Sequence, residues 1–116
     1  MLAQSNRLAK DKDFEKVFKL GKSAYAKALG VKARANQLKR NRYGIIVSAK
    51  VSKKAIERNK LKRRLSGILK KFDQEAYKGL DVAVIVLPPA LTQSYQGLSD
   101  ELKQIFIRLK LFKPDK

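Results

Sequence analysis

The segment spanning residues 50–71 combines dense positive charge with an apolar repeat, and this combination limits what the chain can fold into. It contains ten Lys or Arg residues and a single acidic residue, Glu57. Large apolar side chains recur through it at spacings of three and four, which is typical of one buried face of a helix. We therefore predict a helix over residues 52–72 that packs on a core and keeps its charges exposed. Its buried stripe comprises Leu61, Leu65, Ile68, Leu69 and Phe72.

The charge of the whole chain points to a polyanionic partner. The 116 residues include 28 Lys or Arg and 10 Asp or Glu, which gives a formal net charge of +18. Such a field attracts phosphate backbones, anionic membranes or acidic proteins, and nucleic acid is the leading candidate among these. A lysine-rich face that is merely solvated is the plain alternative. The near-absence of acids within the segment favours binding over solvation.

Length and composition predict one domain over residues 1–116. An apolar fraction of 44% argues against disorder, although residues 1–10 are polar and basic and are expected to form a flexible basic arm. The longest apolar run, residues 82–87, is far too short to cross a bilayer, and no signal-peptide core is visible at the start. We therefore expect a cytoplasmic protein with no membrane partner.

The remaining elements follow from local patterns. A first helix is expected from Asp11 or Asp13 through Leu20. The order of the expected helices and strands along the chain predicts an α/β sandwich, in which helices pack on one sheet. Residues 43–48 are mostly β-branched and apolar, and we expect this strand to be central in the sheet. Further strands are predicted over residues 29–33 and 80–87, and a last helix over residues 93–109.

The residue types present do not predict a self-sufficient catalyst. Cysteine and histidine are absent, which removes thiolate nucleophiles, the commonest general base and the usual transition-metal ligands. Asp11, Asp13 and Glu15 could hold a hydrated divalent ion, but lysines alternate with them, so a structural role is favoured. Ser48 and Ser66 have no base near them in sequence. We therefore predict no catalytic residue and no metal site in the protein itself.

Two aromatic residues in the first helix allow two interpretations. Phe14 and Phe18 have the spacing of a buried stripe, and packing in a core is the favoured one. A short helix beside a basic cleft could instead leave one ring exposed as a stacking platform for single-stranded bases. Lys32 and Arg34, on the polar face of the next β-strand, could then bind the backbone of the single-stranded nucleic acid.

The run Arg58-Asn59-Lys60-Leu61-Lys62-Arg63-Arg64-Leu65 closely resembles the arginine-asparagine-arginine signature helix of the bacterial ribonuclease P protein family. Other segments also resemble that family, namely Arg7-Leu8, Asp13-Phe14 and the expected strands at 43–48 and 80–84. The resemblance covers nearly the whole chain. It implies an α+β domain with one sheet of about four strands and three helices, built around a left-handed βαβ crossover, the ribosomal protein S5 domain 2-like fold.

The resemblance also implies a function. Members of the family bind the catalytic RNA of ribonuclease P and help it remove the 5′ leader of precursor tRNA, and the RNA performs the chemistry with Mg²⁺. The expected partners are therefore ribonuclease P RNA and precursor tRNA, and the free protein is expected to be a monomer. A ribosomal or general structured-RNA-binding protein with no role in tRNA processing is the alternative. A major-groove DNA-binding helix is disfavoured because the apolar stripe commits the helix to a core.

Site residues follow from the same resemblance. Phe14 and Phe18 would line a cleft for the single-stranded leader, with Lys32 and Arg34 as further leader contacts. Contacts with the catalytic RNA would come from Arg58, Asn59, Lys60, Lys62 and Arg63, with added charge from Lys50, Lys53 and Lys54.

The chain departs from the family pattern at several positions. Lys60 replaces an arginine and loses the planar fork of the guanidinium. Ser66 stands where another arginine is usual, and Ala49 where a lysine is common. Val31 and Lys32 occupy the first strand where relatives often carry an aromatic residue, so we expect leader stacking to depend more heavily on Phe14 and Phe18.

Overall fold

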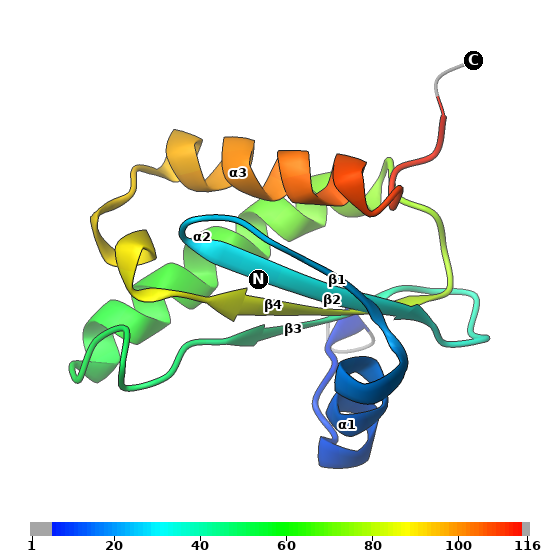
Figure 1. The fold of residues 1–116 in the computed structure, drawn as a ribbon, viewed down its shortest axis with the longest axis horizontal. Coiled ribbons are helices and arrows are strands. Elements are labelled where there is room, and N and C mark those ends of the chain that lie inside the picture. The colour runs from blue at the N-terminus through cyan, green and yellow to red at the C-terminus, as the bar shows by residue number, and fades with distance from the viewer. Residues whose placement is uncertain (1–5, 115–116) are drawn as a thin grey trace.

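The computed structural model describes residues 6–114, which form one mixed four-stranded sheet with helices on both faces (Figure 1). The strands lie in the order β1-β2-β4-β3, with β3 and β4 parallel and the other neighbours antiparallel. The elements are α1 (Asp11–Leu20), β1 (Lys22–Tyr25), β2 (Leu29–Ala35), β3 (Arg42–Ile46), α2 (Ala55–Asp73), β4 (Leu80–Val86), the 3₁₀ helix η2 (Pro88–Thr92) and α3 (Tyr95–Arg108).

The prediction that the strand at 43–48 is central is wrong. Among the described residues, β3 pairs along its length only with β4, so β3 is an edge strand and β4 is flanked on both sides. The outer edge of β3 is partly covered by the preceding chain: Arg7 forms an isolated bridge with Tyr43, and the Leu8 N–H donates to the Tyr43 carbonyl at 2.8 Å. The apolar run in β3 is explained by other elements packing on both faces of the strand, not by a central position in the sheet.

The same contacts correct part of the expected N-terminal arm. Leu8 is buried at 4% exposure, so residues 7 and 8 pack against β3 instead of extending freely into solvent. The first five residues of the predicted arm lie outside the described part of the chain.

The chain passes from β3 through α2 to the adjacent parallel strand β4. In Figure 1, both strands run toward the left, β4 lies above β3, and α2 lies behind them. The connection is therefore left-handed, opposite to the usual hand of such crossovers. The fold class implied by the resemblance, with three α-helices and a four-stranded sheet, is confirmed.

The main core lies between the sheet and the helices α2 and α3. Alternate residues of the strands point into it, and the predicted apolar stripe of α2 meets them there. At one end, Phe72 and Phe106 pack edge to face with ring centroids 5.3 Å apart. Helix α3 begins at Ser94, whose hydroxyl accepts the Gly97 N–H at 2.9 Å and so caps the helix. The two long helices therefore fill one face of the sheet.

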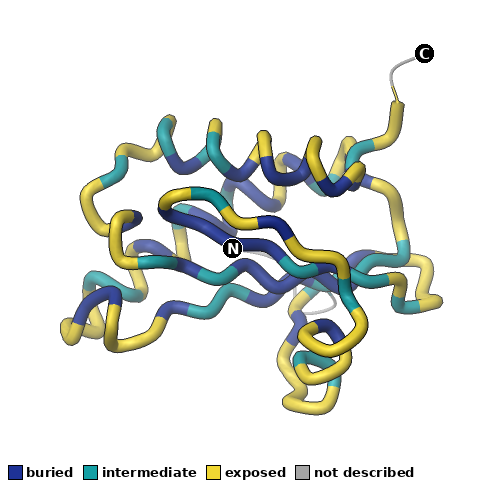
Figure 2. The backbone as a smooth tube through the Cα atoms, in the orientation of Figure 1, coloured by how far each residue is buried: buried dark blue, intermediate teal, exposed yellow. Residues whose placement is uncertain are grey.

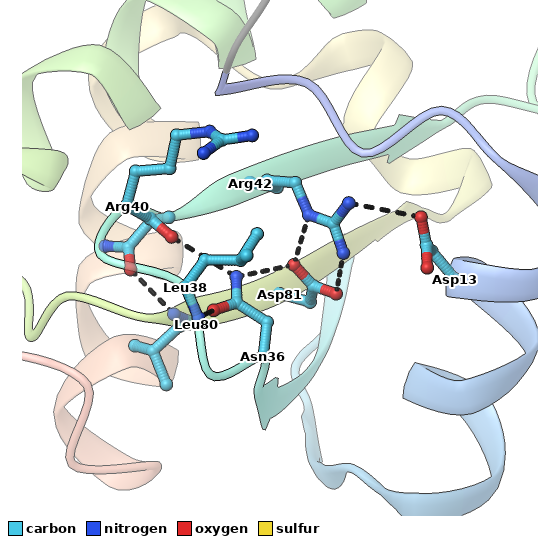
Figure 3. Close-up of polar contacts among 8 residues, drawn as sticks. Asp13, Asn36, Leu38, Arg40, Arg42, Leu80 and Asp81 are labelled. Carbon is cyan, nitrogen blue, oxygen red and sulfur yellow. Dashed lines mark hydrogen bonds and ion pairs between the residues drawn. The ribbon is translucent and has the colours of Figure 1, made fainter.

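Of the described helices, α1 alone packs on the opposite face, where it covers one end of the sheet (Figure 1). Leu8, Val17 and Ala83 form a second small core beneath it, with Phe14 packed against them. An ion-pair cluster fixes the start of α1: Arg42 donates to Asp81 at 2.7 Å and to Asp13 at 3.2 Å (Figure 3). The hydrogen bond and charge of Asp81 raise the pKa of Arg42, so this guanidinium stays charged.

Candidate nucleic-acid interface

Helix α2 presents its cations to solvent because its apolar stripe is held in the main core. Leu61, Leu65 and Leu69 are at most 3% exposed, so the helix cannot rotate without breaking the core. The cations on the other side of the helix and in the loop before it, together with Asn59, form what we call the α2 basic surface. Its members are Lys50, Lys53, Lys54, Arg58, Asn59, Lys60, Lys62 and Arg63, all exposed except the half-buried Arg58.

A small network holds the loop before α2 against the helix. The Ser52 hydroxyl donates to the Glu57 carboxylate and accepts the Lys54 N–H at 3.1 Å. Arg58 donates through Nη1 to the Ser52 carbonyl at 2.9 Å, which leaves its other N–H groups for a ligand. Glu57 is thus bonded to a hydroxyl, and no ion pair to a neighbouring cation is found for it among the described residues. The loop cations are therefore presented in a fixed position.

Asn59 lies in a shallow hollow on α2 that Ile56, Lys62 and Arg63 also line. Ile56 is 80% exposed, an isolated apolar side chain among cations that sequence reasoning did not single out. Ile56 is the second residue of the helix and precedes the buried stripe, and this position is the sequence feature that could have predicted its exposure. Amide, guanidinium and ammonium donors around an apolar floor can bind phosphate and sugar groups of a nucleic acid.

The structure divides the roles of the two phenylalanines of α1. Phe14 is half-buried, and its ring lies on Gly44 so closely that an added Cβ there would be 2.3 Å from Phe14 Cζ. Phe18 is 37% exposed and stacks on Phe14 with ring centroids 6.2 Å apart and an interplanar angle of 27°. Phe14 thus follows the core interpretation, whereas Phe18 retains exposed ring surface.

A hollow between α1 and the end of β3 contains both rings, and we call it the α1–β3 cleft. Phe14, Phe18 and Ile46 supply its apolar lining, with Asp11 and Glu15 at the side of α1. Lys32 extends over the Phe18 ring, with Nζ 5.3 Å from the centroid, in cation–π geometry. Exposed aromatic surface beside a cation is what a single-stranded nucleic acid needs for stacking and charge neutralisation.

Not every predicted leader contact lies in this cleft. Arg34 is opposite Asp81 in the sheet and lines a separate hollow with Asp13, Lys16 and Arg42. In that hollow Asn36 donates to Asp81 at 2.8 Å (Figure 3), so Arg34 lies beside the ion-pair cluster instead of the aromatic rings. Of the two predicted cations, only Lys32 meets an aromatic ring of the cleft.

The loop between β3 and α2 links the two candidate surfaces. Ile46, the last residue of β3, lines the cleft, and Lys50 follows four residues later on the way to α2. Figure 2 shows exposed segments in this loop and along the outer side of α1, whereas the strands of the sheet are largely buried. The aromatic cleft and the α2 basic surface therefore lie on different faces of the sheet and are connected by this loop.

Two of the departures from the family pattern can be placed. Ser66 is only 7% exposed and lies with Lys62 in a hollow beside residues 7–9 and β3. A short hydroxyl there cannot reach an external phosphate as a guanidinium could. Lys60 is fully on the exposed side, where its ammonium keeps the charge.

Three acidic residues of the described chain form structural ion pairs. Asp13 and Asp81 are bonded to Arg42, and Asp73 pairs with Lys78 at 3.2 Å. No group of three or more metal-ligating residues is found within residues 6–114. The described helices also include none with the length and hydropathy needed to traverse a bilayer.

Comparisons with known proteins show which sequences this chain resembles. The family model described as Ribonuclease P matches residues 2–110. The ribonuclease P protein component of Synechocystis sp. is 37% identical over 106 residues, covering 90% of this chain and 86% of that protein. The corresponding protein of Pseudanabaena sp. is 37% identical over 112 residues, covering 96% of this chain and 97% of that protein.

Solved structures show the same similarity. The RNase P protein of Staphylococcus aureus superposes with a TM-score of 0.85 at 28% identity, covering 93% of this chain and 98% of that chain. The RNase P protein of Thermotoga maritima superposes with a TM-score of 0.79 at 31% identity, covering 88% of this chain and 96% of that chain.

Proposed function

Because the chain belongs to the ribonuclease P protein family and is the protein subunit of this tRNA-processing endoribonuclease, we propose that its two surfaces bind different RNAs. The α2 basic surface binds the catalytic ribonuclease P RNA. The α1–β3 cleft binds the 5′ leader of precursor tRNA. The single observation that supports this division is that the exposed cations of α2 and the exposed ring of Phe18 lie on helices anchored in separate cores on opposite faces of the sheet.

The α2 basic surface suits a structured RNA because it is rigid and lacks competing acids. Lys60, Lys62 and Arg63 are exposed, and no hydrogen bond or ion pair is found for them within residues 6–114. Their charges are therefore available to phosphates. Arg63 can present a planar fork to two phosphate oxygens, whereas the lysines act as point charges.

The α1–β3 cleft suits a single strand because stacking does not require base pairing. A leader base that stacks on Phe18 would bring its phosphate toward Lys32, which already lies over that ring. Asp11 and Glu15 border the other side of the cleft and would repel a phosphate there. The backbone of the leader would thus be held on the β2 side of the rings.

In this proposal the metal-dependent chemistry belongs to the RNA subunit. The carboxylates Asp13, Asp73 and Asp81 are paired with cations, which leaves no convergent set of free donors among them for Mg²⁺. When bound by the RNA, Mg²⁺ would supply the activation of water for cleavage. The protein's own contribution is to bind the catalytic RNA and to hold the leader.

The test is reconstitution of the protein with ribonuclease P RNA, with cleavage of precursor tRNA measured at low Mg²⁺. The protein should raise the rate, and Arg63→Ala should weaken its binding to the catalytic RNA. Lys103→Ala is the matched control, because Lys103 is an exposed cation on α3. An equal loss with Lys103→Ala would mean that only net charge matters and would favour a general RNA-binding protein.

A further inference from the structure

Tyr25, the last residue of β1, places a second aromatic site on the open face of the sheet. A Cβ added to Gly30 would lie 2.3 Å from Cε2 and 2.4 Å from Cδ2 of the Tyr25 ring, so the ring lies directly on this glycine. The tyrosine nevertheless keeps 47% of its surface exposed. Glycine at position 30 therefore allows the ring to extend across β2 instead of standing at the edge of the sheet.

The register of the strands shows which residues lie in one row with Tyr25. Tyr25 is opposite Gly30, Gly30 is opposite Ile85, and Ile85 is opposite Ile46. Directly paired residues point to the same face, so these four form one row across the sheet. Ile46 also lines the α1–β3 cleft. The row therefore extends the apolar floor of the cleft from β3 to the β1 edge, and we call it the open row.

Helix α1 leaves the open row uncovered. The adjacent row of the same face runs through Lys32 and Gly44, which contact Phe18 and Phe14 beneath α1. The open row lies one step of two residues further along the strands, roughly 7 Å away. Figure 1 shows α1 at one end of the sheet and the β1–β2 hairpin at the other. A single strand that leaves Phe18 can thus continue over the open row.

Charge favours an RNA strand as the occupant of this row. Lys27 is exposed in the turn after β1, and Arg108 donates from α3 to the Tyr25 carbonyl at 3.2 Å. The acidic neighbour, Glu101, is engaged with the Ala28 N–H at 2.8 Å. With Lys27 two residues away and Arg108 bonded to its main chain, the exposed ring of Tyr25 suits a nucleobase and its phosphate better than an apolar peptide.

We propose that Tyr25 is a second stacking position for the leader of precursor tRNA and a specificity-determining residue of this chain. This inference rests on the proposed function of the cleft. The open face of β2 carries Gly30, Lys32 and Arg34 and offers no aromatic side chain. Tyr25 supplies from β1 the ring that β2 lacks. Leader nucleotides beyond those at Phe18 then contribute to affinity.

The test measures binding of the reconstituted holoenzyme to precursor tRNAs with leaders of increasing length. Tyr25→Ala should lower affinity about five- to tenfold for long leaders, which is the lower part of the range for base stacking. Short leaders and mature tRNA should bind as before. The effect should begin at a longer leader than the effect of Phe18→Ala, because the open row lies beyond Phe18. Tyr25→Phe should retain affinity, since it keeps the ring.

Two further variants separate stacking from a general effect. Tyr77→Ala removes a tyrosine of similar exposure, 45%, at a distant site and should leave leader binding unchanged. Gly30→Val should displace the Tyr25 ring and weaken binding to long leaders, with no further loss when combined with Tyr25→Ala. If Gly30→Val weakens binding to long leaders as much in the Tyr25→Ala protein as in the parent, the proposal is contradicted.

The inference and the proposed function fail in different ways. If Phe18→Ala has no leader-dependent effect, the cleft is not the leader site and both fail. If Phe18→Ala has that effect but Tyr25→Ala weakens all substrates equally, or none, only the inference about Tyr25 is overturned.

Discussion

Helices α1 and α2 pack on opposite faces of the same sheet, and both are rich in lysine, yet they are anchored very differently. Six residues of α2 are buried, whereas Val17 is the one buried residue of α1. Because one side of α2 is deeply buried, the position of its cations is fixed. Because α1 has little buried surface, Phe18 stays partly exposed on a sheet face where no second helix of residues 6–114 packs.

This difference separates stability from recognition. The face with α2 and α3 holds the large apolar core, so most of the folding free energy arises there. On the other face, α1 covers the small residues Ala83 and Gly44, and the open row keeps apolar surface available for a ligand. The comparison predicts that substitutions under α2 change stability, whereas substitutions around α1 change binding.

The largest expected effect is on folding. Leu65→Ala should lower the free energy of unfolding by about 3 kcal/mol, because it leaves a cavity in the main core. Val17→Ala, in the small core under α1, should cost less, about 2 kcal/mol. Urea denaturation of both variants measures the difference. A larger loss from Val17→Ala would mean that the α1 side carries more of the stability than this comparison assigns to it.

The second effect is on binding to the catalytic RNA. Combining Lys62→Ala with Arg63→Ala should reduce the log–log salt slope of binding by about 1.5, because roughly two phosphate contacts are lost. Both side chains are exposed, so the free energy of unfolding should change by less than about 0.5 kcal/mol. Affinity measured at several salt concentrations tests this. An unchanged slope would place the phosphate contacts elsewhere.

The third effect distinguishes the two stacked rings. Phe18→Ala should weaken binding to leadered tRNA by about fivefold or more with little loss of stability. Phe14→Ala should weaken binding and also destabilise the fold, because Phe14 packs on Gly44 and the small core. Parallel melting and binding measurements separate the two outcomes. Equal destabilisation by both variants would show that Phe18 is also a core residue.

The smallest effect concerns pH. Burial and the neighbouring Asp73 raise the pKa of Tyr43 above its ordinary value of 10.0. The folded state therefore holds this proton more tightly than the unfolded chain. The stability that Tyr43 contributes is fully present below pH 10 and declines above it, by about 1.4 kcal/mol per pH unit. Tyr43→Phe should be less stable than the parent at pH 8, because it loses the 2.7 Å hydrogen bond to Asp73.

The difference in unfolding free energy between Tyr43→Phe and the parent should shrink between pH 10 and pH 11. Asn41 is the other side chain bonded to this hydroxyl, and it has no charge to titrate. A constant difference across this pH interval would mean that Tyr43 is not the titrating group.

The sequence predicted elements whose burial follows from local periodicity. Helix α2 and strand β4 were predicted because each presents an apolar pattern along its own length. The place of β3 in the sheet was predicted wrongly. An apolar run indicates that both faces of a strand are buried, but it does not indicate which strands pair with it. Strand β1 has one buried residue, Ala24, and carries almost no pattern.

The site was predictable in its charges and not in its contacts. The exposed cations of α2 followed from the helical wheel and the family signature. The contacts of Arg42 with Asp13 and Asp81 join residues 29 and 39 positions apart, which local patterns do not reveal. Tyr25 was one of four scattered tyrosines until strand pairing placed its ring on Gly30.

The central claim is that α2 and the cleft bind different RNAs, and one measurement tests it directly. Dissociation constants for precursor and mature tRNA are compared in holoenzymes assembled, at saturating protein, with Phe18→Ala or with the combined Lys62→Ala and Arg63→Ala protein. Phe18→Ala should reduce the preference for precursor over mature tRNA, whereas the α2 variant should retain that preference once assembled. Loss of the preference in the α2 variant, with Phe18→Ala unaffected, would contradict the account.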